Sequence, residues 1–335
     1  MALQTSGAIS LNDIHVEAGG TSGTTVSMND ADVRGLISKA SGATMSFSEW
    51  YGASNEFAFT ISSNTQSGNI ATLATAAGWD GSSYLVATVA SGVYMWSDST
   101  ASGGVEITGT FPSGMKLINN GRIMGKGGGG GGSGDDGSHN YGGAGGPAIR
   151  ITSTSSITVQ NNSGAYIGGG GGGGAGGNNG PSNASGGGGA GGGPRGGYHS
   201  QGGGGGGGSI GNVGSLPTGG SATAGGAGGA GGTANYNKSN STHGGGGGRI
   251  FPGTGGTSPY WVQNPTNNAV GFTAGGSGGS AGNGGGSVND YSTGGGGGGW
   301  GATGGNSRGR TAGSGGAAIS GSCTLSNSGT IYGST

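Results

Sequence analysis

Side chains that could carry out catalysis or bind a metal are few and far apart in this 335-residue sequence. Metal sites need clustered His, Cys or carboxylate groups, and the four histidines are widely separated: His15, His139, His199 and His243. Asp135 and Asp136 with His139 form one acidic cluster, and such a cluster is more often a solvated turn than a metal site. From residue 137 onward the only carboxylate is Asp290, so the carboxylate pair of a glycosidase cannot form there. We therefore predict no metal, no cofactor and no enzymatic activity.

The spacing of glycines offers only weak support for nucleotide binding. Residues 121–127 (GRIMGKG) resemble a phosphate-binding loop, but the loop is one spacer short and has glycine where a Ser or Thr hydroxyl should hold Mg²⁺. Gly-x-Gly-x-x-Gly occurs many times, as expected by chance in a chain with 99 glycines. Repeated Arg-Gly-Gly tracts, typical of RNA binding, are absent from the sequence. We predict no nucleic-acid partner.

The residues best suited to recognition lie in segments between the glycine runs. Loop 249–273 contains prolines that stiffen it, and rigid aromatic anchors with a few polar groups suit binding. Its candidate binding residues are Arg249, Phe251, Tyr260, Trp261 and Gln263. Other loops contribute His139, Tyr141, Asn179, Leu216 and Arg308. The alternative explanation is that these aromatic residues only cover the end or side of the glycine region.

Composition narrows the class of protein. Collagen needs a three-residue glycine period and abundant proline, but this chain has eight prolines and continuous glycine runs. Disorder is favoured by high net charge and few aromatic residues, but the net charge is −1 and aromatic residues occur along the whole chain. Residues 137–335 hold six Lys or Arg and one acid. This excess of cations favours an anionic surface or merely aids solubility, and both explanations stay open.

Cysteine content and hydrophobic patterning indicate where the chain folds. Its one cysteine, Cys323, cannot form an intrachain disulfide. The sequence shows no secretory signal and no apolar run long enough for a transmembrane helix. We expect folding in a cytosol without disulfides.

Residues 1–54 predict two or three short helices. Ser10 and Ser27 are each followed by Asp three residues later, and Ser46 by Glu49, which is close to a capping box. The predicted small core consists of Leu11, Ile14, Val33, Leu36, Ile37, Phe47 and Trp50.

Residues 55–125 predict a β-rich module. Residues 56–61 alternate as a strand does; residues 84–96, 105–108 and 115–118 add strands rich in β-branched and aromatic residues; and residues 68–79 form an Ala-rich helix.

A repeat brackets the glycine-rich region. Residues 117–125 (LINNGRIMG) resemble residues 159–168 (VQNNSGAYIG) and residues 325–333 (LSNSGTIYG). Each copy predicts a strand, an Asn/Ser-Gly turn and a second strand, and Asn and Gly tolerate the positive φ of hairpin turns. We therefore expect β-hairpins that pair with one another at one end of the glycine region.

The predicted fold is a small α N-terminal domain (1–54), a β-rich middle module (55–125) and a polyglycine-II helix bundle (126–317) with little regular helix or strand. Residues 148–166 are a β insertion in the bundle, and residues 318–335 form a C-terminal strand that closes on the β module. Backbone groups in the polyproline-II conformation point outward and must be paired when dry. We predict ten such runs: 127–134, 142–146, 168–177, 184–193, 202–208, 219–232, 244–248, 274–286, 293–305 and 312–317.

If these runs alternate outward and back, their order places the connecting loops. The predicted distal loops are 135–141, 178–183, 209–218, 249–273 and 306–311. The loops predicted at the base are 194–201, 233–243 and 287–292.

Several segments resemble proteins of tailed bacteriophages. Residues 6–13 (SGAISLND) and 46–54 (SFSEWYGAS) are similar to the start of many phage tail proteins. Residues 77–83 (AGWDGSS), 91–94 (SGVY), 111–114 (FPSG) and 118–121 (INNG) resemble the middle of glycine-rich tail fibres. Residues 315–321 (GGAAISG) and 329–333 (GTIYG) resemble their C-terminal ending.

The alternation of glycine runs and loops is similar to the distal tail-fibre adhesins of T-even-type phages. This resemblance implies a polyglycine-II sandwich in the virion tail, whose distal loops bind an outer-membrane protein or surface glycan of a bacterium. It also implies attachment to other phage tail proteins, which we assign to residues 1–54, and leaves a homotrimer open. The N-terminal segment departs from the fibre-capping domain of those adhesins.

Two other functions compete with a receptor-binding adhesin. The glycine region could be a purely structural spacer in the tail, with another chain binding the receptor. An ice-binding protein with a flat glycine face is a remote alternative, because such proteins usually rely on disulfides.

Overall fold

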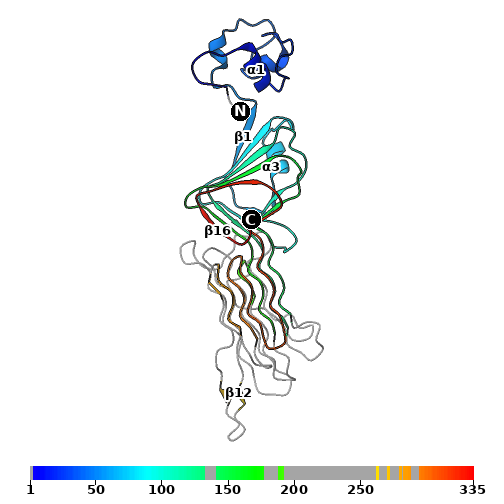
Figure 1. Cartoon of the computed structure of the whole chain (residues 1–335), viewed down its shortest axis with the longest axis vertical. Helices are drawn as coiled ribbons and strands as arrows, with labels where there is room; N and C mark the ends of the chain where they lie inside the picture. Colours follow the sequence, from blue (N-terminus) through cyan, green and yellow to red (C-terminus); the bar gives the residue numbers. More distant parts are fainter. Residues whose placement is uncertain are drawn as a thin grey trace.

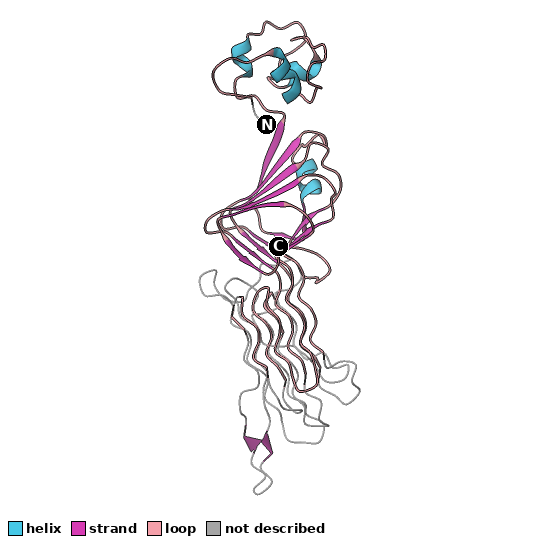
Figure 2. Ribbon diagram, viewed as in Figure 1, coloured by secondary structure: helices cyan, strands magenta, loops and turns pink. Residues whose placement is uncertain are grey.

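The computed structural model describes residues 3–132, 141–176, 188–191, 262–263, 270–271, 279–280, 282–287 and 294–335. The chain is elongated (Figure 1), with the N-terminal helices at one pole, β-sheets in the middle, and extended glycine segments at the other pole. Strands greatly outnumber helices in the described residues (Figure 2). None of the described helices combines the length and apolar character that crossing a membrane requires.

The N-terminal helices are α1 (Leu11–Glu17), α2 (Ala31–Gly35) and the 3-10 helix η1 (Phe47–Trp50). Predicted capping boxes form at Ser10 with Asp13 and at Ser46 with Glu49. The third cap was wrong: α2 begins after Asp30, whose carboxylate accepts a hydrogen bond from the backbone N–H of Ser27 (2.8 Å).

The N-terminal segment has a small core of its own. Leu3, Ile14, Val33 and Trp50 are buried in it, and the Trp50 indole donates a hydrogen bond to the Val33 carbonyl (3.0 Å). The predicted core member Phe47 is instead 40% exposed. Its ring lies beside Trp50 at a centroid distance of 6.2 Å, outside this core.

Three parallel sheets follow, and each successive strand of the chain belongs to the next sheet. Sheet A contains β1 (Glu56–Ile61), β4 (Tyr84–Val89), β7 (Met115–Asn119), β10 (Ile157–Asn161) and β15 (Thr324–Asn327). Sheet B contains β2 (Thr65–Gln66), β5 (Tyr94–Trp96), β8 (Arg122–Met124), β11 (Tyr166–Gly168) and β16 (Thr330–Tyr332). Sheet C contains β3 (Gly68–Asn69), β6 (Val105–Ile107), β9 (Ile149–Ile151) and β14 (Ile319–Ser320). We call one strand from each sheet, taken in chain order, a rung.

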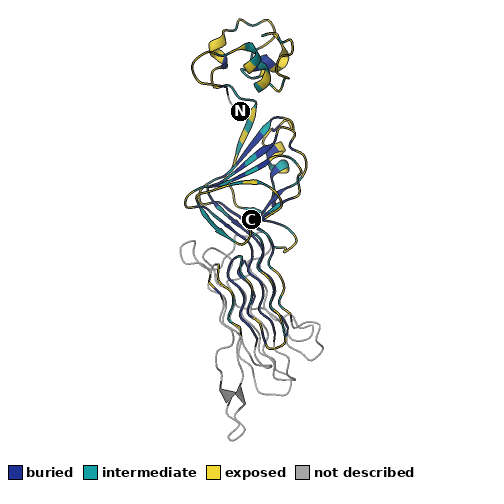
Figure 3. Ribbon diagram, viewed as in Figure 1, coloured by how far each residue is buried: buried dark blue, intermediate teal, exposed yellow. Residues whose placement is uncertain are grey.

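The core lies between the three sheets (Figure 3), because alternate residues of every strand point inward. One rung illustrates this: Leu85 from sheet A, Met95 from sheet B and Ile107 from sheet C are all fully buried. Helix α3 (Ile70–Ala76), between β3 and β4, adds buried Ile70 and Ala74. It is shorter than the predicted helix 68–79, since residues 68–69 pair as strand β3.

The repeated strand–turn–strand segments are corners of the stack, so the hairpin prediction was wrong. β7 and β8, in the first copy, do not pair with each other: β7 pairs with β4 and β10 in sheet A, and β8 pairs with β5 and β11 in sheet B. The turn between them has little room, because a Cβ on Gly121 would lie 2.5 Å from the Val93 carbonyl oxygen. The strand pairing shows that the copies stack on one another in parallel.

Stacking aligns the first asparagine of each repeat into a ladder. Asn119, Asn161 and Asn327 are in register on sheet A, and the first two are fully buried. The Asn119 amide donates to the Asn161 side-chain carbonyl (2.9 Å), and the Asn161 amide donates to that of Asn327 (2.9 Å). Asn119 also accepts a hydrogen bond from the Gly121 N–H (3.0 Å). The corner is thus held by side chains that satisfy one another.

The fold-class prediction was also wrong in its main element. The regular architecture is a stack of parallel β-sheets, and a bundle of polyglycine-II helices is not shown. The predicted insertion 148–166 holds β9 and β10, which pair within the same sheets as the strands before and after it. Glycine-rich segments leave the stack after β8 and β11 and return at β9 and β14. The error arose because the predicted hairpins hid the parallel stack.

The described glycine segments run side by side as extended chain below the sheets (Figure 1). Gly128 and Gly131 donate hydrogen bonds to the carbonyls of Gly171 and Gly174 (2.8 Å each). A side chain could not be accommodated, since a Cβ on Gly173 would lie 1.9 Å from the Gly129 carbonyl oxygen. Close approach of backbones therefore requires glycine here. β12 (Val262–Gln263) and β13 (Val270–Gly271) form a separate antiparallel pair.

Candidate functional site

The described glycine segments end, away from the sheets, at Tyr141 and the loop 306–312, which we call the far pole. Gly142 donates a hydrogen bond to the Thr311 carbonyl (3.2 Å), and Gly145 donates to the Ser314 carbonyl (2.9 Å). Two segments that are far apart in the sequence are therefore joined, and they carry Tyr141 and the loop to the same place.

Hydrogen bonds close the loop 306–312 at its neck. The Asn306 side-chain carbonyl accepts from the Ala312 N–H (2.9 Å). Ser307 and Arg310 exchange backbone hydrogen bonds (3.3 and 3.0 Å) around Arg308 and Gly309. Gly309 has a φ of 72°, which suits glycine at a tight turn. The turn holds Arg308 at its exposed apex.

Tyr141 and Arg310 contact each other across the far pole. The Arg310 Nη1 donates to the Tyr141 hydroxyl (3.3 Å), and its guanidinium carbon lies 5.5 Å from the Tyr141 ring centroid. Tyr141 is 50% exposed, so part of its ring stays open to solvent. This cation–π pair presents an aromatic surface beside one guanidinium group, in the same loop region as the exposed Arg308, and such a combination can bind sugars or anionic groups.

Two predicted site residues lie at the far pole: Tyr141 and Arg308. Gln263 lies on β12, where its backbone pairs with Val270, and its side chain is not described. The other candidates fall outside the described residues: Arg249, Phe251, Tyr260, Trp261, His139, Asn179 and Leu216. Their proposed role in recognition stays a prediction.

Sequence reasoning missed Arg310 and Asn306. Arg308 was named as a candidate binding residue, but these two other residues of its loop were not. A Gly between two cations beside Asn is a turn pattern, which could have indicated a closed loop presenting charge.

The predicted position of loop 287–292 was wrong where the structure describes it. The Ser287 hydroxyl accepts from the Asn306 N–H (3.0 Å), which places Ser287 at the far pole rather than the base. The run 293–305 was counted as one pass, but it turns at Trp300 and Gly301. Trp300 is fully buried against Met124 of sheet B, so its burial imposes a turn that counting glycines cannot detect.

Charge at the far pole is positive in the part of the chain that the structure describes. Its charged side chains are Arg308 and Arg310. Among the described residues, none after Glu106 in the sequence has a side-chain carboxylate. Over the described ranges no three His, Cys, Asp or Glu side chains come together as metal ligands would.

Comparison with known proteins gives one distant structural likeness. No protein-family profile matches the sequence, and no curated protein matches it. A solved structure that the chain is similar to is the crystal structure of the gp37–gp38 adhesin tip complex of the bacteriophage S16 long tail fiber. The two chains are 21% identical over 99% of each, with a TM-score of 0.47.

Proposed function

We propose that this chain is a phage tail-fibre adhesin that contacts a bacterial surface receptor through its far pole. The observation that carries the proposal is the exposed Tyr141–Arg310 pair with Arg308, held at the end of hydrogen-bonded glycine segments. The sequence resemblance to tail-fibre adhesins supports the same function. The receptor is an outer-membrane protein or a surface glycan.

Rigid support of the far pole favours recognition over simple tethering. Backbone hydrogen bonds join segments 125–132, 142–148, 169–175 and 311–318 at lengths of 2.7–3.2 Å. Binding residues that are already held in place lose less conformational entropy when they meet a partner. A flexible glycine chain would instead lose much of its freedom on binding, because glycine is the most mobile residue when free.

We further propose that residues 1–54 attach the chain to another tail protein in the virion. This segment has its own core around Trp50 and lies at the opposite end of the molecule from the glycine segments (Figure 1). The two poles then serve different partners. Assembly of three copies into a homotrimer stays a prediction.

The test is adsorption of the purified full-length chain to a panel of bacterial strains. We expect binding to some strains, with a loss of about tenfold or more on combined Tyr141→Ala and Arg308→Ala, because interface anchors commonly carry most of the binding energy. Lys116→Gln, on the outer face of sheet A, is the matched control and should bind as the parent does.

Combined Tyr260→Ala and Trp261→Ala tests the predicted loop 249–273 in the same assay. Unchanged adsorption in both combined variants would overturn the proposed binding residues. If the unaltered chain adsorbs to none of the strains on which its phage forms plaques, the result would favour the alternative function as a structural spacer.

A further inference from the structure

A row of aligned side chains on the outer face of sheet B forms a second candidate site. Tyr94 of β5, Arg122 of β8 and Tyr166 of β11 are in register. Their neighbours Met95, Ile123 and Ile167 belong to the core. Because side chains alternate between the two faces of a strand, the row points away from that core.

Arg122 is held between the two tyrosines. Its guanidinium carbon lies 5.2 Å from the Tyr94 ring centroid and 5.7 Å from the Tyr166 ring centroid. Its Nη1 donates to the Tyr94 hydroxyl (3.3 Å). A guanidinium that lies between two aromatic rings is fixed in orientation.

Among the described residues, no carboxylate balances the charge of Arg122. None of the ion pairs among the described residues includes it. Its Nε is buried and makes no hydrogen bond, although the residue as a whole is only partly buried. Buried donors are nearly always satisfied in proteins, so this edge of the guanidinium calls for an acceptor.

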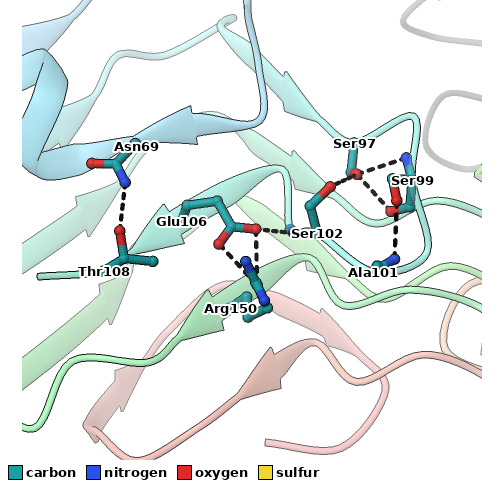
Figure 4. A network of polar contacts seen from close by, with 9 residues as sticks. Asn69, Ser97, Ser99, Ala101, Ser102, Glu106, Thr108 and Arg150 are labelled. Carbon is teal, nitrogen blue, oxygen red and sulfur yellow. Dashed lines mark hydrogen bonds and ion pairs between the residues drawn. The ribbon is translucent and has the colours of Figure 1, made fainter.

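The corresponding row of sheet C shows how this chain otherwise treats an arginine. Arg150 is in register with Glu106, and its Nε lies 2.9 and 3.1 Å from the two carboxylate oxygens (Figure 4). Glu106 is buried and also accepts from the Gly103 N–H (2.5 Å). Arg122 has a tyrosine on either side where Arg150 has a carboxylate.

The row lies beside an apolar wall. Tyr94 packs in one cluster with Trp96, Met124, Ala190 and Trp300, and Tyr166 packs against the same cluster. Apolar surroundings strengthen an electrostatic contact because they keep water from screening it. The site therefore combines a fixed guanidinium, two hydroxyl-bearing rings and a wall of low polarity.

We propose that Arg122, Tyr94 and Tyr166 bind an oxyanion, a carboxylate or phosphate such as bacterial surface glycans carry. The guanidinium edge donates charge-assisted hydrogen bonds to the anion. The site lies on the sheets, away from the far pole, and it does not depend on the function proposed for that pole.

The test is titration of the full-length protein, labelled with ¹⁵N-arginine, with sodium phosphate, sodium glucuronate or neutral glucose at constant ionic strength. The Nε–Hε resonance of Arg122, assigned by its loss in Arg122→Lys, should shift and saturate at millimolar anion and stay unchanged with glucose. Saturation with phosphate alone or with glucuronate alone identifies the preferred source. No shift with either anion, or equal shifts of all arginine resonances, would overturn the site.

Variants connect the shift to the geometry. In Tyr166→Leu the Arg122 resonance remains observable, and the anion affinity should fall by about tenfold, because one face of the guanidinium is released. Arg308→Gln, at the far pole, should leave the titration unchanged while it reduces adsorption to cells. Unaltered affinity in Tyr166→Leu would contradict the proposal, whether or not the far pole proves to bind a receptor.

Discussion

The asparagine ladder is the feature whose contribution to stability can be worked out most directly. Replacing Asn161 with Ala removes the middle side chain of the ladder, which is fully buried. Three hydrogen bonds are lost: from Asn119 (2.9 Å), to Asn327 (2.9 Å) and to the Thr330 carbonyl (3.4 Å).

The size of the loss follows from what the partners retain. The Asn119 amide keeps its bond to the Tyr166 carbonyl (3.2 Å), and the Asn327 carbonyl keeps its bond from the Gly329 N–H (3.1 Å). Neither side-chain partner is left without a hydrogen bond, so the full cost of burying an unsatisfied side-chain group does not apply. At about 1 kcal/mol for each hydrogen bond, we expect the free energy of unfolding to fall by roughly 3 kcal/mol.

The measurement is urea unfolding followed by the circular dichroism of the β-sheets. The control is Asn162→Ala, one residue further along: Asn162 is only partly buried and bonds to Asn120 and Gln160 (2.7 Å each). Water can replace these bonds, so we expect a loss of less than about 1 kcal/mol. A loss for Asn161→Ala no larger than that of the control would refute the ladder's role.

An isosteric change adds a pH test. In Asn161→Asp, the ionised carboxyl cannot donate to Asn327, and burial raises the pKa of the introduced carboxyl in the folded state. The folded state then binds a proton more readily than the unfolded state. The variant's deficit in unfolding free energy should therefore shrink as pH falls toward about 4, and a constant deficit would contradict this reasoning.

Three further predictions concern other parts of the molecule. Gly173→Ala should destabilise the glycine segments strongly and lower the melting temperature, because the added Cβ would lie 1.9 Å from a carbonyl oxygen. Gly35→Ala is the control and should be tolerated, since a Cβ added there has no heavy atom within 4 Å. Backbone N–H groups at residues 83 and 82 lower the pKa of Asp80 from 3.8 to about 2. The stability that ionised Asp80 contributes is present above its unfolded pKa and is lost as pH falls through its folded pKa. The free energies of unfolding of wild type and Asp80→Asn should therefore converge between about pH 4 and pH 2. The difference is small because Asp80 is exposed. Arg150→Gln should cost about 1–3 kcal/mol in urea unfolding, because it leaves the buried Glu106 carboxylate without its cation, and a Glu106→Gln, Arg150→Gln double variant should recover part of that loss.

Much of the β structure could be predicted from local sequence. Alternating residues predicted the first strand at residues 56–61, and the structure has β1 at the same bounds. Serine followed by an acid at the third position predicted two capping boxes correctly, because these bonds join residues close in the chain. The third, at Ser27, failed because Ser27 lies before the start of α2 and Asp30 is its N-cap.

Strand pairing could not be predicted in the same way. A strand–turn–strand pattern is equally consistent with a hairpin and with a corner between two sheets. The choice depends on contacts between residues more than forty positions apart, such as Asn119 with Asn161. Once the hairpin was assumed, the parallel stack and the correct fold class were out of reach.

The candidate site was predictable only in part. Tyr141 and Arg308 stood out as unusual residues between glycine runs, but their sequence separation hides the contact of Tyr141 with Arg310. The aligned Tyr94, Arg122 and Tyr166 were equally invisible, since each was seen only as part of its own strand.

The sequence by itself determined the strand at residues 56–61, the capped starts of α1 and η1, and the glycine runs whose backbones pack closely, because alternation, capping and the absence of Cβ act over a few residues. Only the tertiary structure decided that the strands stack in parallel, which side chains share a row, and which loops meet at the far pole. Those outcomes depend on register and burial among segments that are distant in the chain, and no local pattern encodes them.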